Sequence, residues 1–446
     1  MKTPRLMGAV CLALALPVCN GQTKQAPFAL NELSSLIGNA RGQNATTPAL
    51  TLDEVERIAL AENPKIHVAA RKVAAAEAHV PVAGALDDPQ AMYRGWQVPL
   101  RRPWDYNSAQ NMLMLGQSFP GRGKRELRTN IAQSDVQMAK EDLEEARLRV
   151  RIEVRKAFFD LLHAQDDLRV HDEHVGIAQQ AIEAARIKYS VGKIPQVEIL
   201  KAQVALTRLA EHMIRFGRDA EVARAHLNTL MSRPADAAIE VRGDYALETT
   251  LPPLESLVAK AMQARPDLAA AVSAEAKSRE EEHLARKAMV PDFSIAAGYM
   301  LMPSGQNPRN NYMLEGSMSL PWLNRRKHDA EVHEAAAALS EKSAEITAMK
   351  NEAVGQIQEA LANARAAQHL ARVYHDSLKP QAEQTLHAAV VAYENDQTSF
   401  LDLLDSQMTV VDVDLALIDA TADFNTKMAD LELAVGAPMV VPGVKK

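Results

Sequence analysis

Cysteine is almost absent from this 446-residue chain, since its only two cysteines, Cys11 and Cys19, lie close to the N-terminus. The rest of the chain can therefore form neither an intramolecular disulfide nor a thiolate metal site. The sequence also lacks a nucleophile motif, a phosphate-binding loop and a zinc-helix signature, which indicates a protein that is not an enzyme. The net charge of −7 is mild, and without a basic stripe a nucleic-acid partner is not expected.

Long apolar runs are missing as well, apart from one at the N-terminus. Residues 6–18 are apolar and follow Lys2 and Arg5, a pattern typical of an export signal and too short to span a bilayer alone. Two processing routes are open: cleavage after Gly21, or lipidation of Cys19 within the loose lipobox LPVC. No later stretch reaches the length of a transmembrane helix.

The thirteen histidines do not form a recognisable metal site. His171 and His174 share a helix face, and His328 and His333 follow the last predicted strand, but neither pair has an evident third ligand. We therefore expect no bound metal and no cofactor. The methionines of the predicted strands are interpreted as packing residues rather than a copper relay. They are Met112, Met114, Met300, Met302, Met313 and Met318.

The chain carries an internal duplication. ALAENP at residues 59–64 returns as AMQARP at 261–266, and QSFP at 117–120 returns as MSLP at 318–321, offsets of roughly 200 residues. Tyr189 pairs with Tyr393 in the same way. A duplication that preserves breakers and apolar positions predicts two similar halves. We expect one half alone to be unable to bury its apolar face.

Proline is missing from residues 123–189, and glycine occurs there only at Gly123 and Gly176. A helix over this stretch would be about 100 Å long. The matching stretch, 324–393, has one proline, Pro380, at the position equivalent to Gly176, which predicts a kink shared by both long helices. Return helices are expected near 196–232 and 400–435, and the narrow apolar stripe favours coiled-coil-like packing.

Two pairs of short, strand-like runs precede the long helices, at residues 91–98, 111–119, 293–302 and 312–320. Their lengths suit tilted transmembrane strands. Trp96, Trp104 and Trp322 lie in or beside them, as expected for a membrane interface, although a soluble hairpin cap remains open. In the last run, Tyr312, Leu314, Gly316, Met318 and Leu320 alternate with Met313, Glu315, Ser317 and Ser319, and only Met313 departs from an apolar–polar pattern.

Several segments carry a resemblance to the TolC-like outer-membrane efflux protein family. Residues 189–193 (YSVGK) resemble its helix tip, residues 400–407 (FLDLLDSQ) its second return helix, and Phe119-Pro120 and Leu320-Pro321 its strand-to-helix corners. The resemblance covers about residues 51–437. The corners at Pro89 and Pro291, together with the methionine-rich strands, are similar to the heavy-metal branch of the family.

This resemblance implies a mainly α fold with a small β part. Duplicated long-helix hairpins would form a trimeric α-barrel, and four strands per protomer would contribute to a shared twelve-stranded outer-membrane β-barrel. The protein would be the exit duct of a tripartite efflux or secretion system with passive, gated conduction. Its partners would be an inner-membrane transporter, a periplasmic adaptor and outer-membrane lipid. The alternative function is a soluble periplasmic coiled-coil scaffold or adaptor.

The resemblance also suggests gate residues at the periplasmic aperture. Asp402 and Asp405 share a helix face and would form acidic rings in a trimer. Glu198 and Lys201 stand at the equivalent positions of the first half, where Lys201 would pair with an acid, and Tyr393 matches a family tyrosine near the aperture. A solvated helix face is the alternative for these charges, and core packing is the alternative for Tyr393.

The exposed tip at Val191, Gly192 and Lys193 matches the segment that docks the adaptor, although Gly192 also suits an ordinary helix ending. The expected organisation is a signal peptide at 1–21, an N-terminal arm at 22–50, a first helix/β-hairpin repeat at 51–250, a second at 251–437, and a C-terminal tail at 438–446.

Overall fold

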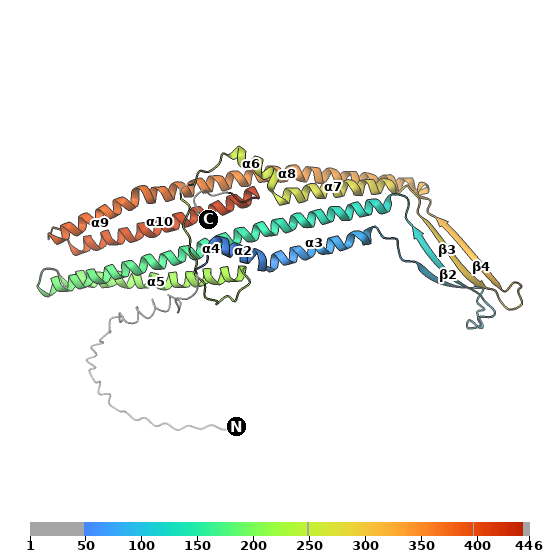
Figure 1. Ribbon diagram of the computed structural model, residues 1–446, viewed down its shortest axis with the longest axis horizontal. Coiled ribbons are helices and arrows are strands. Elements are labelled where there is room, and N and C mark those ends of the chain that lie inside the picture. Colours follow the sequence, from blue (N-terminus) through green and yellow to red (C-terminus); the bar gives the residue numbers. More distant parts are fainter. Residues whose placement is uncertain (1–48, 248, 396, 440–446) are drawn as a thin grey trace, which may run out of the picture. The chain divides into compact units, whose positions relative to one another are not determined.

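The structure is a computed structural model that describes residues 49–247, 249–395 and 397–439. The predicted signal peptide, Cys19, nearly all of the N-terminal arm and most of the C-terminal tail lie outside the described residues. Within the described part, the two repeats follow the same order of short helices, strands, long helix and return helix, and only the second long helix is divided by a π-helical turn (Figure 1).

The first repeat consists of two short helices, a pair of strands, a long helix and a return helix. These are α2 (Leu52–Glu62), α3 (Pro64–Ala83), β1 (Gln90–Trp96), β2 (Gln110–Phe119), α4 (Lys124–Ser190) and α5 (Gln196–Leu230). A capping box starts α2, in which the Glu54 carboxylate accepts hydrogen bonds from the Thr51 N–H and hydroxyl.

The second repeat follows the same plan. It comprises α6 (Leu254–Ala264), α7 (Pro266–Lys287), β3 (Phe293–Leu301), β4 (Asn310–Met318), a 3₁₀ turn η1 (Pro321–Asn324), α8 (Arg325–Val373), a π-helical turn η2 (Tyr374–Leu378), α9 (Lys379–Glu394) and α10 (Phe400–Val435). The predicted strands and return helices are therefore confirmed to within about two residues, the usual scatter at element ends. No helix of the described chain is both long and apolar enough to cross a bilayer.

The shared kink is found in one repeat only. α4 is a single α-helix of 67 residues that runs through Gly176 without interruption. In the second repeat the π-helical turn immediately precedes Pro380. Proline has no N–H and its ring crowds the carbonyl four residues earlier, whereas glycine keeps its N–H and the regular hydrogen bond. The prediction was therefore wrong for Gly176, and the helix is irregular only before Pro380.

Each repeat buries a core of its own, contrary to the expectation that one half could not. In the first repeat α2, α4 and α5 pack around Val55, Phe158 and Leu227. In the second, α6, α8 and α10 pack around their counterparts Leu257, Leu361 and Leu431. In each repeat one short helix and the return helix cover enough of the long helix to enclose these side chains. Equivalent positions of the two repeats thus form equivalent cores.

The two repeats meet where α4 packs against α10. Leu148 and Ile152 of α4 contact Ala429 and Leu433 of α10 in a small apolar cluster. Beside it the Arg155 guanidinium donates to both Glu56 and Glu432, and the Glu432 side chain is only 1% exposed. Such an ion pair holds the repeats in register, because removing either partner would leave a buried charge without its counter-ion.

The four strands form one antiparallel sheet in the order β1-β2-β3-β4. Pairing of β2 with β3 joins the two repeats, with Gly116 opposite Ala296 and Phe119 opposite Phe293. At the corner below the sheet, Asp292 accepts from the Gly121 N–H at 2.6 Å and pairs with Lys124 at 2.8 Å. Figure 1 shows the sheet beyond the ends of α3, α4, α7 and α8 that lead into it.

Candidate functional site

The helix tips of both repeats are joined by one apolar cluster. Its buried members come from α4, α5 and α10, and include Ile182, Ala202 and Phe400. Tyr393 of α9 packs against the same cluster, with its ring centre 5.8 Å from that of Phe400. The structure therefore brings the predicted gate tyrosine into contact with both repeats, in agreement with core packing of its ring.

Lys188, near the end of α4, is the partner of Tyr393 that sequence analysis missed. Its Nζ lies 3.6 Å from the centre of the Tyr393 ring and donates to the Tyr393 carbonyl oxygen at 3.3 Å. The phenolic oxygen of Tyr393 is buried and has no hydrogen-bond partner among the described residues. The ring face, and not the hydroxyl, is thus the part of Tyr393 that binds the other tip.

Asp402 lies in the first turn of α10 and acts as a helix cap. Its carboxylate accepts from the Ser399 N–H at 3.2 Å, the Ser399 hydroxyl at 2.8 Å and the Thr398 hydroxyl at 2.9 Å. These hydrogen bonds, chiefly that from the Ser399 side chain, hold the pKa of Asp402 below its usual value. Asp402 therefore stays ionised at neutral pH, as an acidic ring requires.

The other three predicted gate charges lie close to the same tips. Asp405 is exposed one turn further along α10 than Asp402. Glu198 is half-buried in the first turn of α5, and its Oε2 has no hydrogen-bond partner among the described residues. Lys201 is exposed and makes no ion pair with any described residue.

The predicted docking residues form the turn between α4 and α5. Gly192 has φ +75° and donates to the Tyr189 carbonyl, and no atom lies within 4 Å of where its Cβ would be. Val191 is 66% exposed, and Lys193 is exposed. The turn therefore presents an accessible surface, and Gly192 is required by its backbone conformation alone.

A line of polar side chains fills the contact between α4 and α10 behind the tips. The His163 Nε2 lies 2.7 Å from Asp419, and the His174 Nε2 lies 3.6 Å from Asp414. Lys379, directly after the π-helical turn, pairs with Asp414 at 2.8 Å. His171 and His174 share a helix face but contact different neighbours, because the His171 Nε2 reaches His212 of α5 at 3.3 Å.

Burial shifts the ionisation of this polar line. It raises the pKa of Asp167 to about 6, even though His163 lies 3.4 Å away. Burial, with the neighbouring His212, lowers the pKa of His171 to about 4. No group of three or more metal-ligating side chains suited to an ion is found among the described histidines, aspartates and glutamates.

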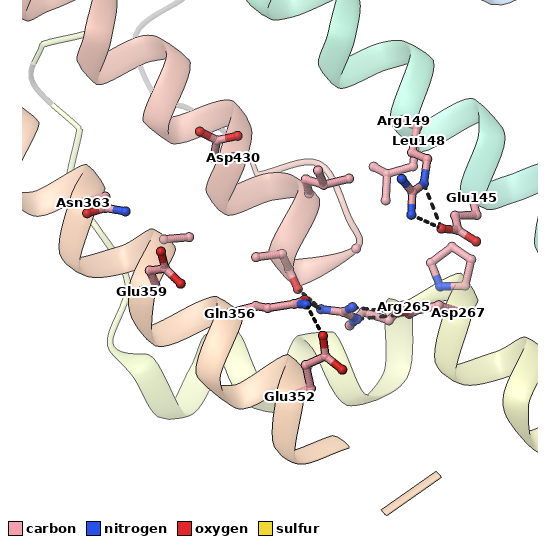
Figure 2. Close-up of a pocket in the computed structure, with 15 residues that line it drawn as sticks. Glu145, Leu148, Arg149, Arg265, Asp267, Glu352, Gln356, Glu359, Asn363 and Asp430 are labelled. Atoms are coloured by element: carbon pink, nitrogen blue, oxygen red, sulfur yellow. Dashed lines mark hydrogen bonds and ion pairs between the residues drawn. The ribbon is translucent and has the colours of Figure 1, made fainter. Parts of the chain in front are cut away.

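A groove of about 530 Å³ lies between α4, α8, α10 and the start of α7 (Figure 2). Arg265 lies across it, donating to Asp267 at 2.6 Å, to Gln356 at 3.0 Å and to the Ala434 carbonyl at 2.8 Å. The rest of the lining includes Glu359 and Asp430. Arg265 therefore connects the end of α10 to the start of α7. Because most of its N–H donors are satisfied by the chain, the groove is not an anion site.

The sheet has one strongly apolar face, as the alternation in the last strand predicted. One row across the sheet consists of Tyr93, Leu113, Tyr299 and Tyr312. These side chains are exposed in the single chain, Tyr312 at 92%. Trp96 is exposed on the opposite face at the end of β1, and Trp104 and Trp322 are exposed outside the strands. A contiguous exposed apolar face of this kind marks a surface that is covered by a membrane or a partner.

Paired long helices that carry a sheet with such a face define an outer-membrane channel of the efflux class. The chain belongs to the outer membrane efflux protein family, whose sequence profile matches residues 56–233 and 257–437. The predicted family, mainly α fold, outer-membrane location and efflux function are thereby confirmed. Members of this family are channels and not enzymes, and the alternative of a soluble scaffold is not supported.

Two curated proteins and two solved structures illustrate the similarity. The chain is 24% identical to the cobalt-zinc-cadmium resistance protein CzcC of Cupriavidus metallidurans, over 81% of this chain and 84% of that protein. It is 20% identical to nodulation protein T of Rhizobium leguminosarum bv. trifolii, over 69% and 68%. The structures are CusC (TM-score 0.74, 17% identity, 89% and 95% covered) and Vibrio cholerae VceC (0.71, 19%, 86% and 96%).

Proposed function

We propose that three copies of this chain form one exit duct, with a shared barrel in the outer membrane and a helical tunnel in the periplasm. The observation that carries this proposal is the open sheet. Within the described chain β1 and β4 each pair on one side only, while the sheet exposes an apolar face. Unpaired strand edges are not tolerated in lipid, so the edges must be closed by strands of neighbouring copies.

The helix tips serve as the gate of this duct. In a trimer Asp402 and Asp405 form two rings of three carboxylates, which attract cations and repel anions. Glu198 and Lys201 take the equivalent places of the first repeat, and Lys201, which has no ion pair among the described residues, pairs with an acid of a neighbouring copy. Lys188 and Tyr393 fasten the tips of each protomer together, so separating them opens the aperture.

The partners are a periplasmic adaptor and an inner-membrane transporter, which supplies the energy for efflux. The adaptor docks on the exposed turn at Val191, Gly192 and Lys193, next to the gate. The name of CzcC, a cobalt-zinc-cadmium resistance protein, favours metal cations as the cargo class. A duct whose apertures carry carboxylate rings suits such cargo, because its electrostatic potential favours cations.

Conductance of the purified protein in planar lipid bilayers tests the duct directly. We expect discrete, cation-selective channels of low open probability, because the contact between Lys188 and Tyr393 holds the tips of each protomer together. Tyr393→Ala should increase the open probability. Absence of discrete channels for both the wild-type protein and this variant would overturn the proposal.

A further inference from the structure

Five methionines gather on one face of the sheet, the face opposite the exposed apolar one. Met112 and Met114 are buried there beside Ala296, and three half-buried methionines pack against them, Met92, Met300 and Met313. Met313, the single exception to the alternation of the last strand, is thus a member of a larger cluster. Sequence analysis missed Met92, because its membership depends on the register of β1 against β2.

The distribution of apolar residue types between the two faces is uneven. Strand pairing places leucine, isoleucine, phenylalanine and tyrosine on the outer face, with Met318 as its one methionine. On the methionine face the same strands carry no leucine, isoleucine, valine or phenylalanine. Packing alone would accept leucine in place of methionine, since the two have similar volumes. The feature shared by the cluster is therefore the thioether group.

Two glycines allow these side chains to converge. Met92 pairs with Met114, and Met114 and Met313 lie on either side of Gly298 in the same row. A Cβ at Gly298 would lie 2.6 Å from the Met114 Cγ, so Met114 occupies the space above this glycine. The Met92 methyl group likewise lies above Gly116, 3.5 Å from where a Cβ would be. Thioethers from three strands are thus directed to one place.

Polar and charged side chains border the methionine cluster. The Gln110 amide donates to the Met300 sulfur, so at least one thioether faces a polar neighbour. Glu315, which pairs with Ala296 in the register, has an Oε2 that is buried and accepts no hydrogen bond among the described residues. This oxygen forms an ion pair with Arg94, whose Nη1 lies 4.0 Å away and which is opposite Met112 on the same face. The charges of Glu315 and Arg94 thus offset each other, and the groups of this face that remain to bind a metal cation are the thioether sulfurs.

We propose that this methionine cluster binds a soft monovalent metal cation, Cu(I) or Ag(I), through thioether sulfur. Thioether ligands select such cations over Zn²⁺, Mg²⁺ and other harder ions. This inference rests on the proposed function in one respect: in the duct the methionine face lines the lumen and meets the cargo. The cluster would then be a binding site for departing metal on the membrane side of the tunnel.

Silver binding to the full-length protein in detergent tests this proposal, since Ag(I) needs no reductant. Equilibrium dialysis measures bound silver, and X-ray absorption at the silver edge identifies its ligands. The test variant is Met114→Leu/Met300→Leu/Met313→Leu, which keeps the apolar volume. The matched control is Met318→Leu, on the opposite face of the same sheet. We expect sulfur ligands in the wild-type and control proteins and loss of the sulfur signal in the triple variant.

An unchanged sulfur signal in the triple variant, or its absence from the wild-type protein, would overturn the methionine site. Bilayer conductance of the same preparations tests the proposed duct independently of silver binding. Channels without sulfur-bound silver would contradict only the site. Sulfur-bound silver without channels would support the site and contradict the duct.

Discussion

The Lys188 ammonium lies over the Tyr393 ring, 3.6 Å from its centre, and thereby joins the tips of two repeats that are separate in the sequence. The contact sits at the end of an apolar cluster that includes Phe400. A cation–π pair at a partly exposed site contributes about 0.5–2 kcal/mol. Three such pairs in a trimer would be enough to bias an aperture towards its closed state and still allow it to open.

Replacing Tyr393 should open the duct only when its ring is removed. Tyr393→Ala eliminates both the cation–π contact and the packing on Phe400, so we expect a higher open probability in bilayer recordings. Tyr393→Phe is the matched control, because the hydroxyl has no hydrogen-bond partner among the described residues. Equal open probabilities for the alanine variant and the wild-type protein would show that Tyr393 does not hold the gate.

Asp402→Ala and Asp405→Ala should differ in their effects on the stability of α10. Asp402 completes the capping box of α10 with Ser399, so Asp402→Ala should lower stability and speed hydrogen exchange in the first turn of α10. Asp405→Ala should leave this exchange unchanged. Both substitutions should lower cation selectivity, and the double variant should lower it most. Unaltered reversal potentials in the double variant would place the carboxylates outside the conduction path.

The turn between α4 and α5 offers a test of adaptor docking that is free of backbone strain. Val191 is exposed and has an ordinary φ, so Val191→Asp should weaken adaptor co-purification without changing thermal stability. Gly192 has φ +75°, which asparagine tolerates better than other side chains. Gly192→Asn is therefore the control for turn conformation. Adaptor recovery equal to wild type with Val191→Asp would remove this turn from the interface.

Asp167 should make the packing of α4 against α10 dependent on pH. Burial raises its pKa in the folded protein to about 6, above the ordinary value of 3.8. The folded state then binds more protons than the unfolded state between these values, so this contribution to stability is present below about pH 4 and lost as the pH rises through 6.

The neutral substitution Asp167→Asn removes this penalty. It should increase protection of α4 from hydrogen exchange at about pH 7, by on the order of 1–3 kcal/mol, and have little effect at about pH 4. The charged neighbours are His163, Asp166, Asp219 and Asp419, and all remain in the variant. Equal protection of the two proteins at about pH 7 would mean that burial does not raise the pKa of Asp167 in the folded protein.

Local rules were sufficient to predict most of the fold. Missing proline over residues 123–189 predicted α4, and period-two alternation predicted β4, because both patterns depend on near neighbours in the chain. The prediction of a kink at Gly176 was wrong, because glycine weakens a helix without removing a backbone hydrogen bond. Pro380 does remove one, and the helix widens just before it.

The partners of the candidate site could not be predicted in this way. Lys188 and Tyr393 are 205 positions apart, and Arg155 and Glu432 are 277 apart. Which side chains meet across two helices depends on the axial register and rotation of both helices, and neither follows from the pattern of a single helix. The full methionine cluster could not be predicted either, since Met92 joins it only through the pairing of β1 with β2.

The mass of the full-length protein extracted from outer membranes in mild detergent tests the central claim most directly. The account predicts a single species of three chains, because the described part of each chain supplies four strands with two unpaired edges and an exposed apolar face. Native mass spectrometry would resolve this species from a monomer. Recovery of a stable monomer from the membrane, with no trimer at any protein concentration, would contradict the shared barrel.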